Sequence, residues 1–189
     1  ISPGSPVSVN SQPMNIPVGD QLLGRIIDGM GNPIDGKGPI TGTKSQPVYN
    51  VPPDPLDRKR ITEVMSTGIR SIDGFLTLGK GQRIGIFSGS GIGKSVLLGM
   101  ISRFTSAEVN VIALIGERGR EVREFIERDL GPEGLKRSVV IVATSDQSAM
   151  VRIKGSLIAT AIAEYFRDEG KDVMFMMDSL TRVALAQRE

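Results

Sequence analysis

Residues 83–95 read RIGIFSGSGIGKS, a short apolar run followed by a loop rich in glycine that ends in Gly-Lys-Ser. The apolar run predicts a β-strand over 83–87, and the apolar spacing after Lys94 predicts a helix to about residue 105. A strand, a glycine-rich turn and a helix in this order are typical of a phosphate-binding loop, G-x-x-x-x-G-K-[ST]. Ser88 stands where that pattern has its first glycine, so the match departs from the pattern by one small residue.

The residue types of this loop suit nucleotide phosphates. Glycines let the backbone curl so that successive N–H groups point at phosphate oxygens, and the N-terminus of the following helix adds its positive end. We expect Lys94 to reach the β- and γ-phosphates of ATP and the Ser95 hydroxyl to hold Mg²⁺. The alternative is a glycine-rich turn with a surface lysine. The predicted nucleotide-binding residues are Gly89, Ser90, Gly91, Ile92, Gly93, Lys94, Ser95 and Val96.

Beyond the loop, apolar strands alternate with amphipathic helices. The patterns predict strands over 109–115, 138–143 and 173–177 and helices over 121–130 and 149–168. Gly131-Pro132 is expected to end the helix over 121–130. Continuous apolar strands separated by amphipathic helices are typical of a parallel sheet covered on both faces. The predicted fold class is therefore α/β with a mostly parallel sheet.

Asp178 comes directly after the apolar run 173–177. A carboxylate at the carboxyl end of a buried strand lies at the ligand-binding edge of an open α/β sheet. Beside a phosphate loop, Asp178 would hold Mg²⁺ through water as a Walker-B acid. The alternative role is to cap the helix that follows.

A charged stretch, GERGRE, follows the predicted strand over 109–115. Glu117 is a candidate for polarising an attacking water, and Arg118 for facing the phosphates. The alternative is a charged loop that leads into a solvated helix. We interpret four neighbouring residues as surface partners of ion pairs at i,i+3 and i,i+4, namely Arg120, Glu121, Arg123 and Glu124.

The composition excludes several classes of function. The 189 residues include 23 basic and 21 acidic side chains, a balance that argues against a nucleic-acid binder built on a basic patch. The sequence has neither cysteine nor histidine, which excludes disulfide frameworks, Ser-His hydrolases and most zinc enzymes. No apolar run approaches the roughly 18–20 residues that span a bilayer. Because histidine and cysteine are absent, acid–base chemistry must come from carboxylates or lysine.

Residues 1–60 are rich in glycine, proline and short β-like runs. The run over 22–27 predicts a strand, and the turn-forming residues after it predict a tight turn. The stretch over 50–55, NVPPDP, predicts an extended connector, because each proline disfavours helix at the residue before it. The basic run Arg58-Lys59-Arg60 is interpreted as part of a solvated linker.

Three motifs occur in order along the chain: GSGIGKSVLLGM (89–100), IGERGREVREF (115–125) and MDSLTRVALAQRE (177–189). Together they resemble the type III secretion ATPases, which include the flagellum-specific export ATPase and the injectisome ATPases. This family is similar to the catalytic β subunit of rotary ATP synthases. The stretch PVGDQLLGRIIDGMGNPIDG (17–36) resembles the family's join between a β-barrel and the core. The resemblance covers nearly the whole chain, and the family accepts a small residue where Ser88 stands.

The resemblance implies a RecA-like P-loop ATPase core that acts on ATP with Mg²⁺. It implies that residues 1–14 are the end of an N-terminal β-barrel and that 15–189 are the core, incomplete at its C-terminal end. In the roles that it implies, Glu117 is the catalytic carboxylate, Arg118 contacts the γ-phosphate, and Lys94 completes the catalytic set. The implied metal ligands are Ser95 and, through water, Asp178.

The resemblance also implies a homohexamer at the cytoplasmic base of an export apparatus on the inner membrane. Its expected partners are stator or regulator, stalk and export-gate proteins and chaperone–cargo complexes, with no nucleic acid and with membrane contact only through partners. Flagellar and virulence export stay open. The family's arginine finger and adenine-stacking aromatic fall beyond Glu189, so we expect weak or no steady turnover by this chain alone.

Three other functions are alternatives. One is a catalytic subunit of another rotary-type ATPase. A second is an RNA-translocating RecA-type helicase of the transcription-termination kind, which the near-neutral charge and the aromatic content of 4% disfavour. A third is a subunit that holds nucleotide without hydrolysis. Glu117 argues against this third function, because the non-catalytic subunits of the rotary family lack that acid.

Overall fold

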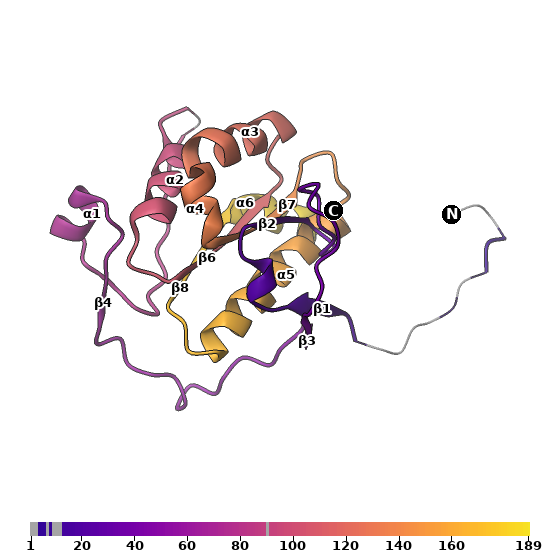
Figure 1. Ribbon diagram of the computed structural model, residues 1–189, viewed down its shortest axis with the longest axis horizontal. Helices are drawn as coiled ribbons and strands as arrows, with labels where there is room; N and C mark the ends of the chain where they lie inside the picture. Colours follow the sequence, from indigo (N-terminus) through magenta and orange to yellow (C-terminus); the bar gives the residue numbers. More distant parts are fainter. Residues whose placement is uncertain (1–3, 7, 9–12, 90) are drawn as a thin grey trace.

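The computed structural model describes residues 4–6, 8, 13–89 and 91–189, and its centre is a four-stranded sheet (Figure 1). The strand order is β2-β7-β6-β8, and every neighbouring pair is parallel. These strands are Arg25–Asp28 (β2), Ser138–Ala143 (β7), Val109–Ile115 (β6) and Val173–Asp178 (β8). The predicted α/β class with a mostly parallel sheet is confirmed.

Helices cover both faces of this sheet (Figure 1). On one face lie α5 (Ala149–Asp168) and α6 (Leu180–Arg188). On the other lie α2 (Lys94–Phe104), α3 (Gly119–Glu124), the π-helix η2 (Phe125–Leu130) and α4 (Gly131–Lys136). The helices that the structure describes include none with both the length and the apolar character needed to cross a membrane.

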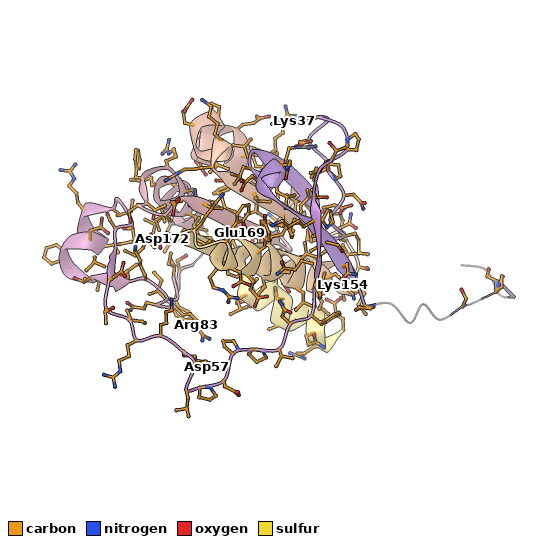
Figure 2. The ribbon with its side chains drawn as sticks, turned by 60° about the horizontal axis from the view of Figure 1, so that its bottom comes forward. Lys37, Asp57, Arg83, Lys154, Glu169 and Asp172 are labelled. Carbon is orange, nitrogen blue, oxygen red and sulfur yellow. The ribbon has the colours of Figure 1, made fainter. Side chains whose placement is uncertain are left out.

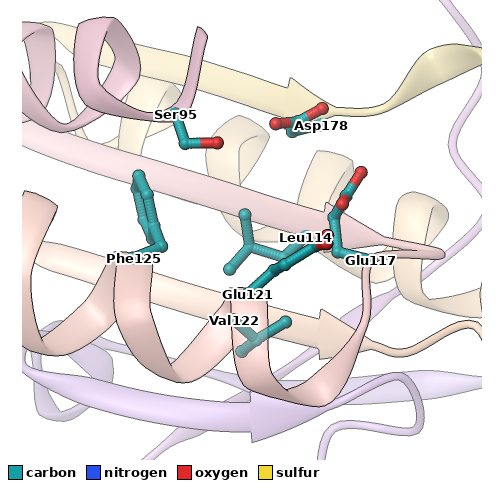
Figure 3. Close-up of a pocket in the computed structure, with 7 residues that line it drawn as sticks. All are labelled: Ser95, Leu114, Glu117, Glu121, Val122, Phe125 and Asp178. Atoms are coloured by element: carbon teal, nitrogen blue, oxygen red, sulfur yellow. The ribbon is translucent and has the colours of Figure 1, made fainter. Parts of the chain in front are cut away.

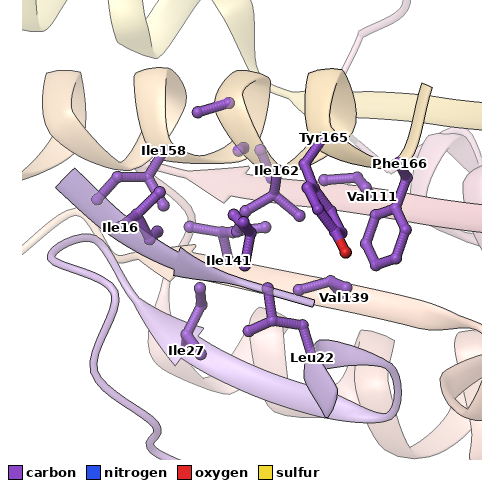
Figure 4. Close-up of a cluster of buried hydrophobic side chains, with 14 of the residues drawn as sticks. Ile16, Leu22, Ile27, Val111, Val139, Ile141, Ile158, Ile162, Tyr165 and Phe166 are labelled. Carbon is purple, nitrogen blue, oxygen red and sulfur yellow. The ribbon is translucent and has the colours of Figure 1, made fainter. Parts of the chain in front are cut away.

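The apolar runs in the sequence become the central strands because both of their faces are covered. Every residue of β6 and of β7 is buried. On the α5 side, Ile158, Ile162 and Phe166 are fully buried one helical turn apart and pack over Val139 and Ile141 (Figure 4). This stripe is the one that the spacing over 149–168 predicts.

Smaller elements precede the sheet. β1 (Asn15–Val18) pairs antiparallel with β3 (Lys44–Pro47), and η1 (Asp20–Leu22) is a short 3₁₀-helix. A second small ladder joins β4 (Val64–Met65) to β5 (Leu78–Gly79), with α1 (Arg70–Phe75) between them. The strand predicted over 22–27 begins three residues later and ends one residue later, at Arg25–Asp28, because Leu22 belongs to the 3₁₀-turn. The barrel end predicted over 1–14 lies mostly outside the described residues.

The prediction of a strand over 83–87 is wrong. This segment has no regular structure, and Phe87 is 97% exposed. An apolar run forms a strand only where a neighbour supplies a hydrogen-bond ladder. Within the described residues, β8 pairs only with β6, and 83–87 does not extend the sheet on its other side. The connector that contains Asp57 is also exposed and runs outside the packed layers (Figure 2).

The helix predicted over 121–130 is longer than expected and changes form. It begins at Gly119 as α3 and continues as the π-helix η2. The helix ends at Leu130 as predicted, because Gly131 has a non-helical backbone with a φ of +66°, but Gly131-Pro132 also opens the next helix, α4. Proline lacks an N–H group, and the first turn of a helix leaves those groups unpaired in any case, so proline is tolerated there.

The edge of the sheet at β2 is closed by its own return loop. Arg25 makes two hydrogen bonds to the Asp35 carboxylate, of 2.6 and 3.0 Å, and a third to the Gly38 carbonyl. Asp35 also accepts from the backbone N–H groups of Ile26 and Lys37. The Arg25 guanidinium, through its hydrogen bonds, holds the pKa of Asp35 far below its ordinary value.

Asp35→Ala is expected to lower the free energy of unfolding by about 3–5 kcal/mol at pH 7, because it leaves the mostly buried Arg25 without its carboxylate. Urea unfolding of the purified chain measures the change. Asp57→Ala, on the exposed connector, is the control and should stay within about 0.5 kcal/mol of the unchanged chain. A loss below about 1 kcal/mol for Asp35→Ala would show that this pair does not hold the edge.

Candidate active site

Three side chains that the sequence analysis singles out converge at the carboxyl edge of the sheet. Ser95 comes from the first turn of α2, Asp178 ends β8, and Glu117 follows β6 (Figure 3). They line one small pocket, together with Leu114, Glu121, Val122 and Phe125. The edge of a parallel sheet where the strands end is where open α/β folds bind ligands.

The glycine-rich loop leads into this pocket through α2. Gly91 and Gly93 have φ angles of +79° and +93°, which side chains rarely adopt, so glycine is required at both positions. Gly93 is the N-cap of α2 and offers no side chain to the first backbone N–H groups, which stay free for an anion. Ile92 and Val96 are exposed, as is Gly89, and the predicted loop residue Ser90 lies outside the described residues.

Lys94 and Asp178 form an ion pair. The Asp178 side chain is 7% exposed and that of Lys94 is 31% exposed. A carboxylate buried this deeply needs a compensating charge, and Lys94 supplies it. Incoming phosphates must therefore compete with Asp178 for the lysine.

The backbone around Glu117 is fixed on both sides. The N–H of Gly116 donates to the Ala143 carbonyl at 2.6 Å, and the Glu117 carbonyl accepts from the Ser145 N–H at 3.0 Å. Gly116 has a φ of +75°, and a Cβ atom there would lie 2.7 Å from the Cβ of Arg182. This tight turn directs the Glu117 side chain toward Asp178 (Figure 3).

The pKa of Glu117 is raised to about 7 from an ordinary value of 4.5, and burial is the largest cause. A hydrogen bond with Glu121 and the negative charge of Asp178 contribute to this rise, whereas Lys94 lowers the pKa. The same hydrogen bond lowers the pKa of Glu121, which acts as the ionised acceptor. Glu117 therefore keeps a proton near neutral pH and shares it with Glu121.

The sequence analysis missed Glu121 and Phe125 as pocket residues. The signal was available, since Glu117, Glu121 and Phe125 recur at intervals of four. The surface interpretation is confirmed for Arg123 and Glu124, which pair with Glu127 and Arg128 one turn further along the helix. For Glu121 that interpretation is incomplete, because its carboxylate both contacts Arg118 and lines the pocket.

Arg118 does not face the pocket. Its side chain is 68% exposed and lies 3.4 Å from a Glu121 oxygen. Arg182, which the sequence analysis also passed over, packs against Gly116 beside Glu117. The structure thus brings Ser95, Glu117 and Asp178 together and holds Lys94 against Asp178.

The donor set fits Mg²⁺ bound together with phosphates. No group of three or more acidic side chains converges as a metal site among the described residues. Mg²⁺ does not need such a group, because it binds through one or two protein oxygens, water and substrate phosphates. Ser95 and Asp178, on the same pocket wall, supply a hydroxyl and a carboxylate for that role.

Residues 68–189 match the nucleotide-binding domain of the ATP synthase alpha/beta family. The chain belongs to this family. The flagellum-specific ATP synthase of Bacillus subtilis (strain 168) is 60% identical over 189 residues, which are 100% of this chain and 43% of that protein. The type 3 secretion system ATPase of Xanthomonas euvesicatoria is 57% identical over 178 residues, 94% and 40% of the two chains. The chain thus spans less than half the length of these relatives.

Solved structures of similar proteins agree with this assignment. The ATPase EscN in complex with its central stalk EscO, from an enteropathogenic E. coli type III secretion system, superposes with a TM-score of 0.87 at 53% identity. That match covers 93% of this chain and 43% of EscN. A prototypical ATPase from the type III secretion system of pathogenic bacteria superposes with a TM-score of 0.85 at 52% identity, over 93% and 51% of the two chains.

Glu117→Gln is expected to stabilise the chain at alkaline pH. Because the fold raises the pKa of Glu117, stability is lost as pH rises from the unfolded value near 4.5 to the folded value of about 7. Glutamine does not ionise, so the advantage of the variant should grow across this interval and level off above pH 7. Urea midpoints from pH 4 to 9 measure it. An advantage that is constant with pH would contradict the raised pKa.

Proposed function

We propose that this protein is the ATP-hydrolysing motor subunit of a bacterial type III protein export apparatus, flagellar or injectisome. The observation that carries the proposal is the convergence of Ser95, Glu117 and Asp178 beside a phosphate loop. The family membership and the identity of 50–60% to export ATPases support it. Flagellar and secretion relatives lie at similar identity, so the proposal covers both.

The loop and α2 bind the phosphates in this proposal. Backbone N–H groups around Gly91 and Gly93 and the N-terminus of α2 cradle the phosphate oxygens. Lys94 leaves Asp178 and moves onto the β- and γ-phosphates. Ser95 and, through water, Asp178 would hold Mg²⁺, which would supply positive charge beside the phosphates.

Glu117 acts on the attacking water. Its carboxyl points into the pocket beside Asp178 and is held there by the Gly116 turn (Figure 3). The ionised form accepts the hydrogen bond that orients the water, so the proton shared with Glu121 must leave before this step. Arg118 contacts the γ-phosphate only if its guanidinium leaves Glu121 and turns inward.

The proposal extends to the assembly. EscN is described as an assembled ATPase with a central stalk. We infer that the present protein likewise forms a homo-oligomer, a hexamer as the family resemblance implies, around a stalk. Its place would be the cytoplasmic base of the apparatus, with stator, export-gate and chaperone–cargo partners and with membrane contact only through them. ATP hydrolysis would then drive cargo unfolding and release from chaperones.

Replacing the phosphate-loop lysine and the proposed catalytic carboxylate in the intact protein separates binding from chemistry. Glu117→Gln should lower kcat for Mg·ATP by at least about a hundred-fold and leave the Kd for Mg·ATP nearly unchanged, because it removes only the group that orients water. Lys94→Ala should weaken Mg·ATP binding itself, because it removes a phosphate contact. A coupled phosphate-release assay and calorimetry measure the two quantities.

Glu127→Gln is the matched control, since Glu127 lies on the surface in a pair with Arg123. It should leave kcat within about two-fold. Hydrolysis by the Glu117→Gln variant at the unchanged rate would contradict the catalytic role and favour a nucleotide-holding subunit. RNA-stimulated hydrolysis by the intact protein would contradict export in favour of RNA translocation.

A further inference from the structure

The phosphate-loop helix touches the π-helix with no side chain between them. A Cβ atom at position 99 of α2 would lie 2.5 Å from the carbonyl oxygen of Asp129 and 2.6 Å from its carbonyl carbon. Real Cβ atoms do not approach a backbone this closely, so residue 99 must be glycine if the two helices keep this separation. The carbonyl group of Asp129 belongs to the backbone, so it cannot move aside by a change of side-chain rotamer.

The segment that Gly99 touches is the one that carries Glu117. After the Gly116 turn, α3 begins at Gly119 and runs without a break into η2, which contains Asp129. Phe125, the first residue of η2, is buried and lines the pocket between Ser95 and Glu121 (Figure 3). A shift of η2 against α2 therefore changes the distance between Ser95 and the carboxyl groups.

η2 is wider than an α-helix at this contact. The N–H of Gly131 bonds to the Ile126 carbonyl five residues earlier, which closes the π-turn. Single π-turns are unusual and frequently lie at functional sites, because they displace the backbone locally. Here the displaced stretch is the one that rests on Gly99.

The far end of α2 is held by the same segment. Arg137, directly after α4, donates hydrogen bonds to the carbonyls of Ser102 (2.9 Å), Thr105 (3.0 Å) and Ala107 (2.8 Å). Ser102 and Thr105 belong to the last turn and the C-cap of α2. Gly99 lies between this fixed end of α2 and the phosphate loop, one turn after Ser95.

We propose that Gly99, through its backbone contact with Asp129, sets the separation between the phosphate-loop helix and the segment that bears Glu117, and is thereby a positioning residue for hydrolysis. This inference rests on the proposed function. Lys94 and Ser95 move with α2 as one unit, so nucleotide contacts survive a change in separation. The alignment of Glu117 with the γ-phosphate, in contrast, is lost when this separation changes.

Gly99→Ala in the intact protein tests the proposal. The added methyl should push α2 away from η2 and lower kcat for Mg·ATP by about 10- to 100-fold, since misplacement by about 1 Å has effects of this size. The Kd for Mg·ADP should stay within about three-fold. Binding of Mg·ADP–aluminium fluoride, which mimics the transition state, should weaken in proportion to kcat.

Gly134→Ala is the matched control. Gly134 also lies in this helical layer, but a methyl there would meet side-chain atoms, Cδ1 of Leu130 at 2.8 Å and Cγ of Arg103 at 3.1 Å, and not a backbone. Its kcat should stay within about two-fold. Thermal unfolding of both variants identifies any loss of folded protein at the assay temperature.

A Gly99→Ala enzyme with unchanged kcat would overturn the inference, and so would one in which kcat and ADP affinity fall together with the folded fraction. If Gly99→Ala does not fold, Arg137→Met replaces it, because it frees the other end of α2. That variant should lower kcat with little change in ADP affinity, and unchanged kcat would overturn the inference. Absence of hydrolysis by the unchanged protein would instead overturn the proposed function.

Discussion

The parallel pairing of β6 with β7 on one side and β8 on the other is the constraint on which the site depends. Its register sets Leu114 opposite Asp178 and Ile115 opposite Ala143. Asp178 therefore ends β8 beside the end of β6, and Glu117 follows two residues after β6 ends, although 61 positions separate the two acids in the sequence. A slip of one residue would turn Asp178 to the other face of the sheet. The full burial of both central strands opposes that slip, because it would expose apolar side chains.

The candidate site holds more acidic than basic groups. Three carboxyl groups, of Glu117, Glu121 and Asp178, share it with the ammonium group of Lys94. One carboxylate pairs with the lysine, and burial together with the hydrogen bond between the other two raises the pKa of Glu117. Bound Mg²⁺ and phosphates would supply both the cation that frees Lys94 and the acceptor that it then contacts. The internal pairs of this pocket are thus ones that such ligands could replace.

Most of the fold could be predicted from the sequence because apolar periodicity reports burial directly. The strands at 109–115 and 138–143, the strand that begins at 173 and the helix over 149–168 lie where their patterns place them. The prediction failed where a strand depends on a neighbouring strand for its hydrogen bonds. The run over 83–87 has strand composition, but within the described residues it has no ladder partner.

The sequence by itself predicted the residues of the candidate site: a glycine-rich loop with Lys94 and Ser95, and acids at or just after the ends of two strands. Those residues are recognisable because their function fixes local spacing. Only the tertiary structure decided that Glu121 turns into the pocket, that Arg118 turns away from it, and that Gly99 rests on the backbone of Asp129. The physical reason is that these features depend on the separation and rotation of packed helices, which are set by contacts between residues far apart in the chain.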